Sequence, residues 1–76
     1  MQAYILITTK ASEVKEALEE IRKNPRIMQV HAVTGPFDLI AMIEGKDMKE
    51  IGDIVVNEIQ KIPGVSRTLT CLVVET

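Results

Sequence analysis

Hydrophobic residues follow two different spacings along the chain, and each change of spacing marks a new element. Runs rich in Ile, Val, Leu and Thr at residues 3–8, 27–34, 37–44 and 65–75 are typical of strands. Between the first two runs, a helical stripe is predicted at Val14, Ala17, Leu18 and Ile21. A second helical stripe is predicted at Ile51, Ile54, Val55, Ile59 and Ile62.

Polar residues, Gly and Pro mark where these elements begin and end. Ser12 offers an N-cap hydroxyl to the first helix, and Asn24-Pro25 ends it, because a residue before Pro avoids the α region. Asp47 is the predicted N-cap of the second helix, and Glu50 three residues later suggests a capping box. Pro63-Gly64 ends that helix, and Gly35-Pro36 is the predicted turn of a hairpin between the second and third strands.

The element order is therefore β-α-β-β-α-β, which predicts an α+β fold of the ferredoxin-like type. Right-handed crossovers place both helices on one face of a four-stranded antiparallel sheet. Such a sheet should alternate apolar and polar residues when its other face meets water. Here the two faces of the third strand are both apolar, with Leu39, Ala41 and Ile43 on one side and Ile40 and Met42 on the other.

Two helices cover only one face, so the second face is predicted to be an exposed apolar patch, which usually marks an interface. A chain of this length buries only about 60% of the surface that its unfolded form exposes, so it is marginally stable alone. Burying the second sheet face against a partner would add a second core and stabilise it. We therefore predict a homodimer packed sheet against sheet, of the dimeric α/β-barrel type. The alternative is that this face binds an unrelated domain.

Composition narrows the possible partners. The net charge is −2 with both signs interspersed, which argues against a nucleic-acid-binding surface. Cys71 is the only cysteine, so we interpret it as a small buried hydrophobe in a reducing compartment. The N-terminus lacks signal-peptide features, and no apolar run approaches the roughly 20 residues of a membrane span. We expect a cytoplasmic protein with no metal site and no cofactor.

Residues suited to catalysis are few. His31 is the only histidine, and its mid-strand position favours an outward or partly buried strand residue over a catalytic base. The loop after the first strand has neither a Cys-x-x-Cys metal motif nor an Arg for an acylphosphatase-like phosphate cradle. Tyr4 and Phe37 are the only aromatic residues, too few for RNA bases to stack on the sheet. We therefore expect no enzymatic activity.

One segment remains with unassigned chemistry, Thr34-Gly35-Pro36-Phe37-Asp38. Gly35 permits positive φ or close backbone approach. Asp38 is a carboxylate at the start of an apolar strand, where it either accepts local backbone N–H bonds or contacts a ligand. The chemistry of the segment alone leaves both roles open.

This segment resembles a known family signature. Residues 33–40, V-T-G-P-F-D-L-I, resemble the V-T-G-x-[YF]-D-hydrophobic motif of the RAM domain, the amino-acid-sensing half of the leucine-responsive regulator (Lrp/AsnC) family. Residues 62–70, I-P-G-V-S-R-T-L-T, look like the family's l-P-G-V-x-x-t-x-T stretch before the last strand. The resemblance covers essentially the whole chain. It implies a non-enzymatic amino-acid effector-binding and oligomerisation module linked to transcription regulation.

The resemblance also implies partners and site residues. Family regulators carry an N-terminal helix-turn-helix, and this sequence begins at the first strand, so we expect a single domain over residues 1–76 without direct DNA binding. Family RAM domains dimerise through their sheets and join into rings of eight or ten chains, so a homo-oligomer, and association with full-length regulators, are expected. By resemblance, Gly35 and Asp38 are the best effector contacts, with Thr34, Thr68 and Thr70 as weaker candidates.

Within this implied site, Asp38 would pair with the effector's ammonium, while backbone N–H groups near Gly35 and the Thr hydroxyls would take its carboxylate. Two alternatives stay open. A small dimeric α/β-barrel enzyme, of the monooxygenase or isomerase type, predicts a cavity lined by His31 or Tyr4. An ACT-like regulatory domain predicts an effector site at a helix–strand junction near residues 8–14.

Overall fold

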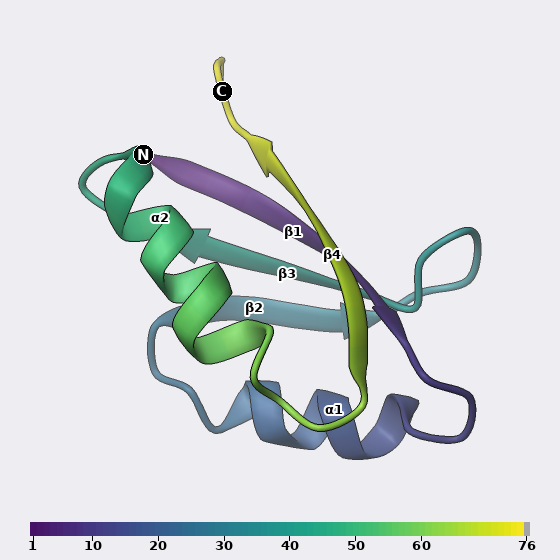
Figure 1. Cartoon of the computed structure of the whole chain (residues 1–76). Helices are drawn as coiled ribbons and strands as arrows, with labels where there is room; N and C mark the ends of the chain where they lie inside the picture. Colours follow the sequence, from purple (N-terminus) through teal and green to yellow (C-terminus); the bar gives the residue numbers. More distant parts are fainter. Residues whose placement is uncertain (76) are drawn as a thin grey trace.

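Four antiparallel strands form one sheet in the order β2-β3-β1-β4 (Figure 1). This computed structural model describes residues 1–75. The elements in chain order are β1 (Gln2–Thr9), α1 (Val14–Arg22), β2 (Ile27–Ala32), β3 (Leu39–Glu44), α2 (Met48–Ile54), the π-helical turn η1 (Val55–Ile59) and β4 (Val65–Leu72). Element order and sheet order confirm the ferredoxin-like prediction.

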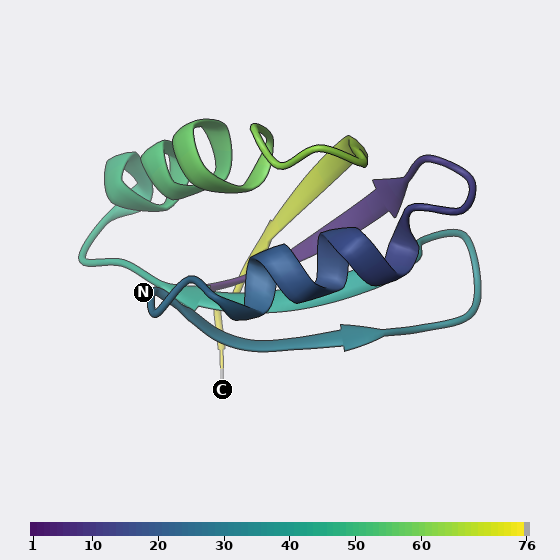
Figure 2. The same cartoon turned by 90° about the horizontal axis from the view of Figure 1, so that it is seen from below.

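Both helices lie on the same face of the sheet, and Figure 2 shows the opposite face without a helix. The core lies between helices and sheet. On the central strands the fully buried side chains alternate, at Ala3, Ile5 and Ile7 of β1 and at Leu39, Ala41 and Ile43 of β3. The helices contribute the predicted stripes, with Ala17, Ile21, Ile51, Ile54, Val55 and Ile59 buried. The periodicity of the sequence thus identified this core correctly.

The opposite sheet face, which we call the outer face, is apolar and exposed. In the strand register, Tyr4 lies between Met42 and Cys71, and Leu6 lies between Ile40 and Leu69. Tyr4 is 41% exposed and Leu69 is 50% exposed, so the predicted uncovered apolar patch is confirmed. Cys71 lies on this face and is exposed in the single chain, so its interpretation as a buried hydrophobe was wrong. Nothing within the described residues covers that face.

Three of the four strands are shorter than the sequence predicts, and β1 is one residue longer at each end. β2 stops at Ala32 and β3 begins at Leu39, so residues 33–38 form a wide loop, closed by the bond from Val33 N to Asp38 O at 2.9 Å. β4 stops at Leu72, and only Val73 N continues the ladder, to Gln2 O at 2.9 Å. β1 begins at Gln2, so later residues of the last run have no ladder partner on it, however strand-like their composition.

The helix starts were predicted with mixed success. Ser12 adopts φ +70° and does not cap α1, whose N-cap is Glu13 without a side-chain cap bond. The Ser12 prediction was therefore wrong, because this residue lies in a tight turn before the helix. Asp47 does cap α2, since its Oδ1 accepts from Glu50 N at 2.9 Å. Glu50 Oε1 accepts from Lys46 N at 3.3 Å instead of from Asp47 N, so half of the capping box forms.

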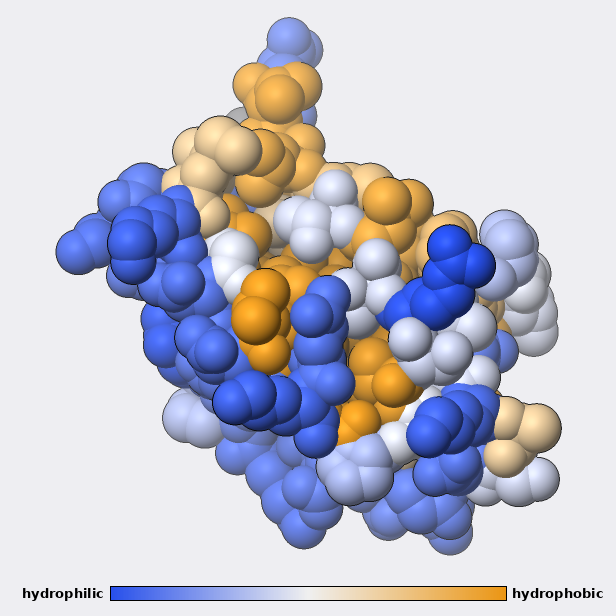
Figure 3. Space-filling model, viewed as in Figure 1, coloured by the Kyte–Doolittle hydropathy of each residue, from blue (hydrophilic) through white to orange (hydrophobic). Residues whose placement is uncertain are grey.

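The second helix contains a feature that the sequence did not predict. Gln60 N donates to Val55 O at 2.8 Å, a five-residue step that widens the helix into the π turn η1. Val55 and Ile59 stay buried, while Gln60 comes within bonding distance of β4. On the helix side, hydrophilic atoms cover both helices, and hydrophobic atoms show between them and near the C-terminal end (Figure 3). No helix among residues 1–75 is long and apolar enough to cross a membrane.

Candidate functional site

The loop at residues 33–38 gathers three of the predicted site residues, Thr34, Gly35 and Asp38. Gly35 adopts φ +132°, a conformation that other residues rarely adopt. A Cβ at Gly35 would meet no atom within 4 Å. Of the two roles considered for Gly35, the structure therefore supports the need for positive φ, and it leaves open space where a Cβ would lie.

Asp38 fastens the start of β3 to the end of β1. Its Oδ2 accepts from Thr9 N at 2.8 Å and from Thr9 Oγ1 at 3.2 Å. Its own N–H donates to Ile7 O at 2.9 Å. Asp38 thus has a structural role, but that role spans two strands instead of lying within the turn. Both side-chain bonds use Oδ2, which leaves Oδ1 outside this clamp.

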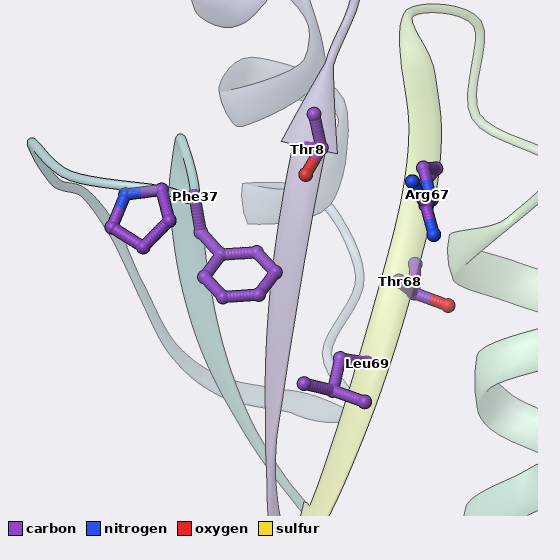
Figure 4. A pocket seen from close by; sticks show the side chains of 6 residues that line it. Thr8, Phe37, Arg67, Thr68 and Leu69 are labelled. Atoms are coloured by element: carbon purple, nitrogen blue, oxygen red, sulfur yellow. The ribbon is translucent and has the colours of Figure 1, made fainter.

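A groove of about 410 Å³ lies beside this loop, at one end of the outer face. Its walls are Thr8, Pro36, Phe37, Arg67, Thr68 and Leu69. The register pairs Thr8 with Arg67, so β1 and β4 form its floor. Figure 4 shows the Phe37 side chain reaching from the loop toward β1, with Arg67 and Leu69 on the neighbouring β4. The groove therefore combines one guanidinium with hydroxyl and apolar groups.

The two threonines predicted on the last strand occupy different places. Thr68 lines the groove, but its Oγ1 accepts from Gln60 Nε2 at 2.8 Å, and Figure 4 shows its side chain pointing away from Phe37. Thr70 lies opposite Ile5, farther along β4, and does not line the groove. Of the five predicted site residues, Thr68 alone lines this groove. Thr34, Gly35 and Asp38 belong to the loop that supplies Pro36 and Phe37, and Thr70 lies apart.

Sequence reasoning missed several walls of the groove, notably Thr8, Phe37, Arg67 and Leu69. Phe37 occupies the aromatic position of the first motif, so the motif itself signalled it. Arg67 falls at a variable position of the second motif, where the resemblance assigns no role. The pairing of Thr8 with Arg67 depends on the β1–β4 register, which no local pattern of the sequence reveals.

A second hollow, of about 380 Å³, lies near the start of α2. It is lined by Arg26, Lys46, Asp47, Lys49, Glu50 and Asp53. Arg26 is already paired, at 2.9 Å with Glu58 and at 3.7 Å with Glu50, so opposite charges largely compensate one another there. Neither of these two hollows is lined by His31 or Tyr4, the residues that the enzyme alternative required.

Comparison with known proteins supports the resemblance. A family model described as the Lrp/AsnC ligand binding domain matches residues 2–76. The HTH-type transcriptional regulator FL11 of Pyrococcus horikoshii is 34% identical over 76 residues, which cover 100% of this chain and 50% of that protein. The crystal structure of TTHA0845 from Thermus thermophilus is 36% identical, with TM-score 0.90, and the match covers 99% of this chain and 94% of that one.

A third similar protein is the transcriptional regulator NMB0573 of Neisseria meningitidis, solved as a complex with L-Met. It is 24% identical with TM-score 0.86, and the match covers 97% of this chain and 49% of that one. The chain spans about half the length of the FL11 regulators that it matches. Because the family model matches nearly every residue, and the fold agrees, this chain belongs to the Lrp/AsnC ligand-binding domain family.

Proposed function

We propose that this chain is a non-enzymatic module that binds a small effector and oligomerises, and that it serves transcription regulation. The observation that carries this proposal is the groove beside the Gly35–Asp38 loop, in a chain of a ligand-binding family. Its volume, about 410 Å³, lies in the range of small-molecule sites. The similar proteins named as transcriptional regulators favour this role over catalysis.

The effector that we propose is an amino acid. The Neisseria regulator of the same fold was solved with L-Met, which supports this ligand class. In the proposed site Asp38 offers Oδ1 to the ligand's ammonium, because the bonds from Thr9 use Oδ2. Gly35 sets the shape of the loop with its positive φ, and Thr34 adds a hydroxyl on that loop. Thr68 is a weaker member, because its hydroxyl already accepts from Gln60. Thr70 is also a weaker member, since it lies opposite Ile5, farther along β4 and away from the loop.

The partner that we propose for the outer face is a second copy of this chain. Exposed Tyr4 and Leu69 adjoin Leu6, Ile40 and Met42 in the strand register, and together they form one apolar surface. Covering it would add the second core that so short a chain lacks. The same surface would allow association with full-length regulators of the family, whose sensing halves share this fold.

A thermal-shift screen of the twenty amino acids tests effector binding. A ligand that binds only the folded state adds about 2.7 kcal/mol of stability at 100 times its Kd. We therefore expect a higher unfolding temperature with at least one amino acid at millimolar concentration. Arabinose at the same concentration is the control for nonspecific solute effects. If no amino acid raises the unfolding temperature above that control, the sensing role is wrong.

A further inference from the structure

We propose that the groove recognises its ligand by the carboxylate, through Arg67, and that the ligand class is a small carboxylic acid with a compact apolar tail. This inference rests on the proposed function and goes one step further. It assigns the dominant charge contact to Arg67, a residue outside the predicted site, and makes the ammonium of an amino acid secondary.

Charge is the first argument. Arg67 is the only ionisable residue among the walls of the groove. No salt bridge within residues 1–75 involves it, whereas Arg26 has two carboxylate partners. A guanidinium presents paired N–H donors in a plane that fits a carboxylate with two parallel bonds. A ligand carboxylate in the groove would therefore meet an available cation.

The walls of the groove offer no negatively charged group to a ligand's ammonium. No Asp or Glu lines the groove. Asp38 follows Phe37 in the chain, but Thr9 already donates two bonds to its carboxylate. A ligand ammonium would reach only Oδ1 of that group, from outside the groove walls. The asymmetry between Arg67 and Asp38 predicts that the carboxylate contributes more affinity than the ammonium.

The remaining walls define the rest of the ligand. Pro36, Phe37 and Leu69 give the groove its apolar walls. Thr8 adds a hydroxyl directly across the register from Arg67. The Thr68 hydroxyl accepts from Gln60, the residue after η1, so it is turned from the apolar wall. A short branched or thioether tail could lie against these apolar walls.

Three probes that share one tail separate the two charges. L-Methionine carries both groups, 4-(methylthio)butanoate carries only the carboxylate, and 3-(methylthio)propylamine carries only the ammonium. Each is titrated into ¹⁵N-labelled protein while amide shifts are followed by NMR. We expect the two carboxylates, and not the amine, to move the amide signals of Thr8, Phe37 and Leu69. Binding by the amine without the acid, or no movement with any probe, overturns the inference.

Arg67→Gln supplies the second measurement. Charge-assisted bonds contribute about 1.5–3 kcal/mol, which corresponds to roughly 10- to 100-fold in affinity, so we expect a loss in that range for 4-(methylthio)butanoate. Arg22→Gln is the matched control, because Arg22 is exposed at the end of α1 and does not line the groove. Equal affinity in Arg67→Gln and Arg22→Gln overturns the inference. The amino-acid screen remains independent, since another amino acid bound elsewhere would raise stability without moving these signals.

Discussion

At the scale of single residues, Asp38 joins β1 to the start of β3 through its bonds from Thr9, whether or not it also contacts a ligand. Replacing it with Ala removes the acceptor of two bonds from Thr9, one of them from a backbone N–H at 2.8 Å. Leaving such a donor unpaired costs about 1–3 kcal/mol, so we expect Asp38→Ala to lower the free energy of unfolding by that amount. Asp38→Asn keeps an acceptor oxygen and should lose less. Urea unfolding at one fixed protein concentration measures both.

The control for Asp38→Ala is Asp53→Ala. Asp53 is an exposed carboxylate of α2 whose 3.2 Å bond to Lys49 is a surface pair, worth about 0.5 kcal/mol or less. If Asp38→Ala loses no more stability than Asp53→Ala, the clamp between β1 and β3 is energetically unimportant. A ligand response that is unchanged in Asp38→Ala would further restrict Asp38 to this structural role.

The sequence predicted the hydrogen-bonding role of a residue only where the bonding partner lies nearby in the chain. Asp47 capping Glu50 N was predicted, because cap and donor lie three residues apart. The Asp38–Thr9 clamp was not predicted, because its partners are 29 residues apart and meet only through the β1–β3 register. Arg67 was missed for the same reason, since Thr8 and Phe37 reach it only in the folded sheet.

At the scale of elements, two glycines, Gly52 inside α2 and Gly64 between η1 and β4, should respond oppositely to Ala. Gly64 adopts φ +96°, and an added Cβ would lie 3.1 Å from Glu13 Cβ. Strain and crowding together should cost about 1–3 kcal/mol in Gly64→Ala. Gly52 lies inside α2 with nothing within 4 Å of an added Cβ, so Gly52→Ala should gain up to about 1 kcal/mol from helix propensity.

Thermal and urea unfolding of Gly64→Ala and Gly52→Ala, at matched protein concentration, measure the change in stability of each variant. A loss in Gly52→Ala would mean that an unseen neighbour occupies the exposed side of α2. If Gly64→Ala leaves the free energy of unfolding unchanged, the junction between η1 and β4 adjusts to the added Cβ without cost. The bond from Lys10 N to Gly64 O at 2.8 Å argues against such an adjustment, because it holds Gly64 in place. Each variant thus serves as the reference for the other.

Element type was predictable here, but element ends and helix winding were not. Apolar periodicity gave every helix and strand in the correct order, because burial on one face imposes that period. Ends at Ala32, Leu39 and Leu72 depend on where a ladder partner stops, which is a property of the neighbouring strand. The π turn preserves the same buried stripe at Val55 and Ile59, so the pattern does not distinguish it from an α-helix.

At the scale of the whole molecule, the outer face is where sequence and structure agree most usefully. The sequence predicted two apolar faces from strand alternation, and the structure confirms an uncovered one. What covers it is a proposal, and solution mass tests it. Two copies of the 8.5 kDa chain make the smallest assembly that hides the face, so we expect light scattering to report twice the chain mass or a multiple of that.

Tyr4→Glu supplies the decisive variant. Tyr4 is 41% exposed, so the single chain should tolerate the change, whereas a carboxylate buried against a second apolar sheet is costly. We expect Tyr4→Glu to shift the mass toward that of one chain. Val56→Glu is the control, because Val56 is 53% exposed on η1, on the helix side.

The reactivity of the Cys71 thiol also reports whether a second copy covers the outer face. Cys71 pairs with Tyr4 in the register and is exposed when the chain is alone. If a second sheet covers the outer face, the Cys71 thiol should react slowly with a bulky thiol reagent in the wild type and in Val56→Glu. It should react at least about ten times faster in Tyr4→Glu, because the population of the open face rises as the equilibrium shifts. A wild type with single-chain mass and a fast thiol would mean that the outer face serves another partner.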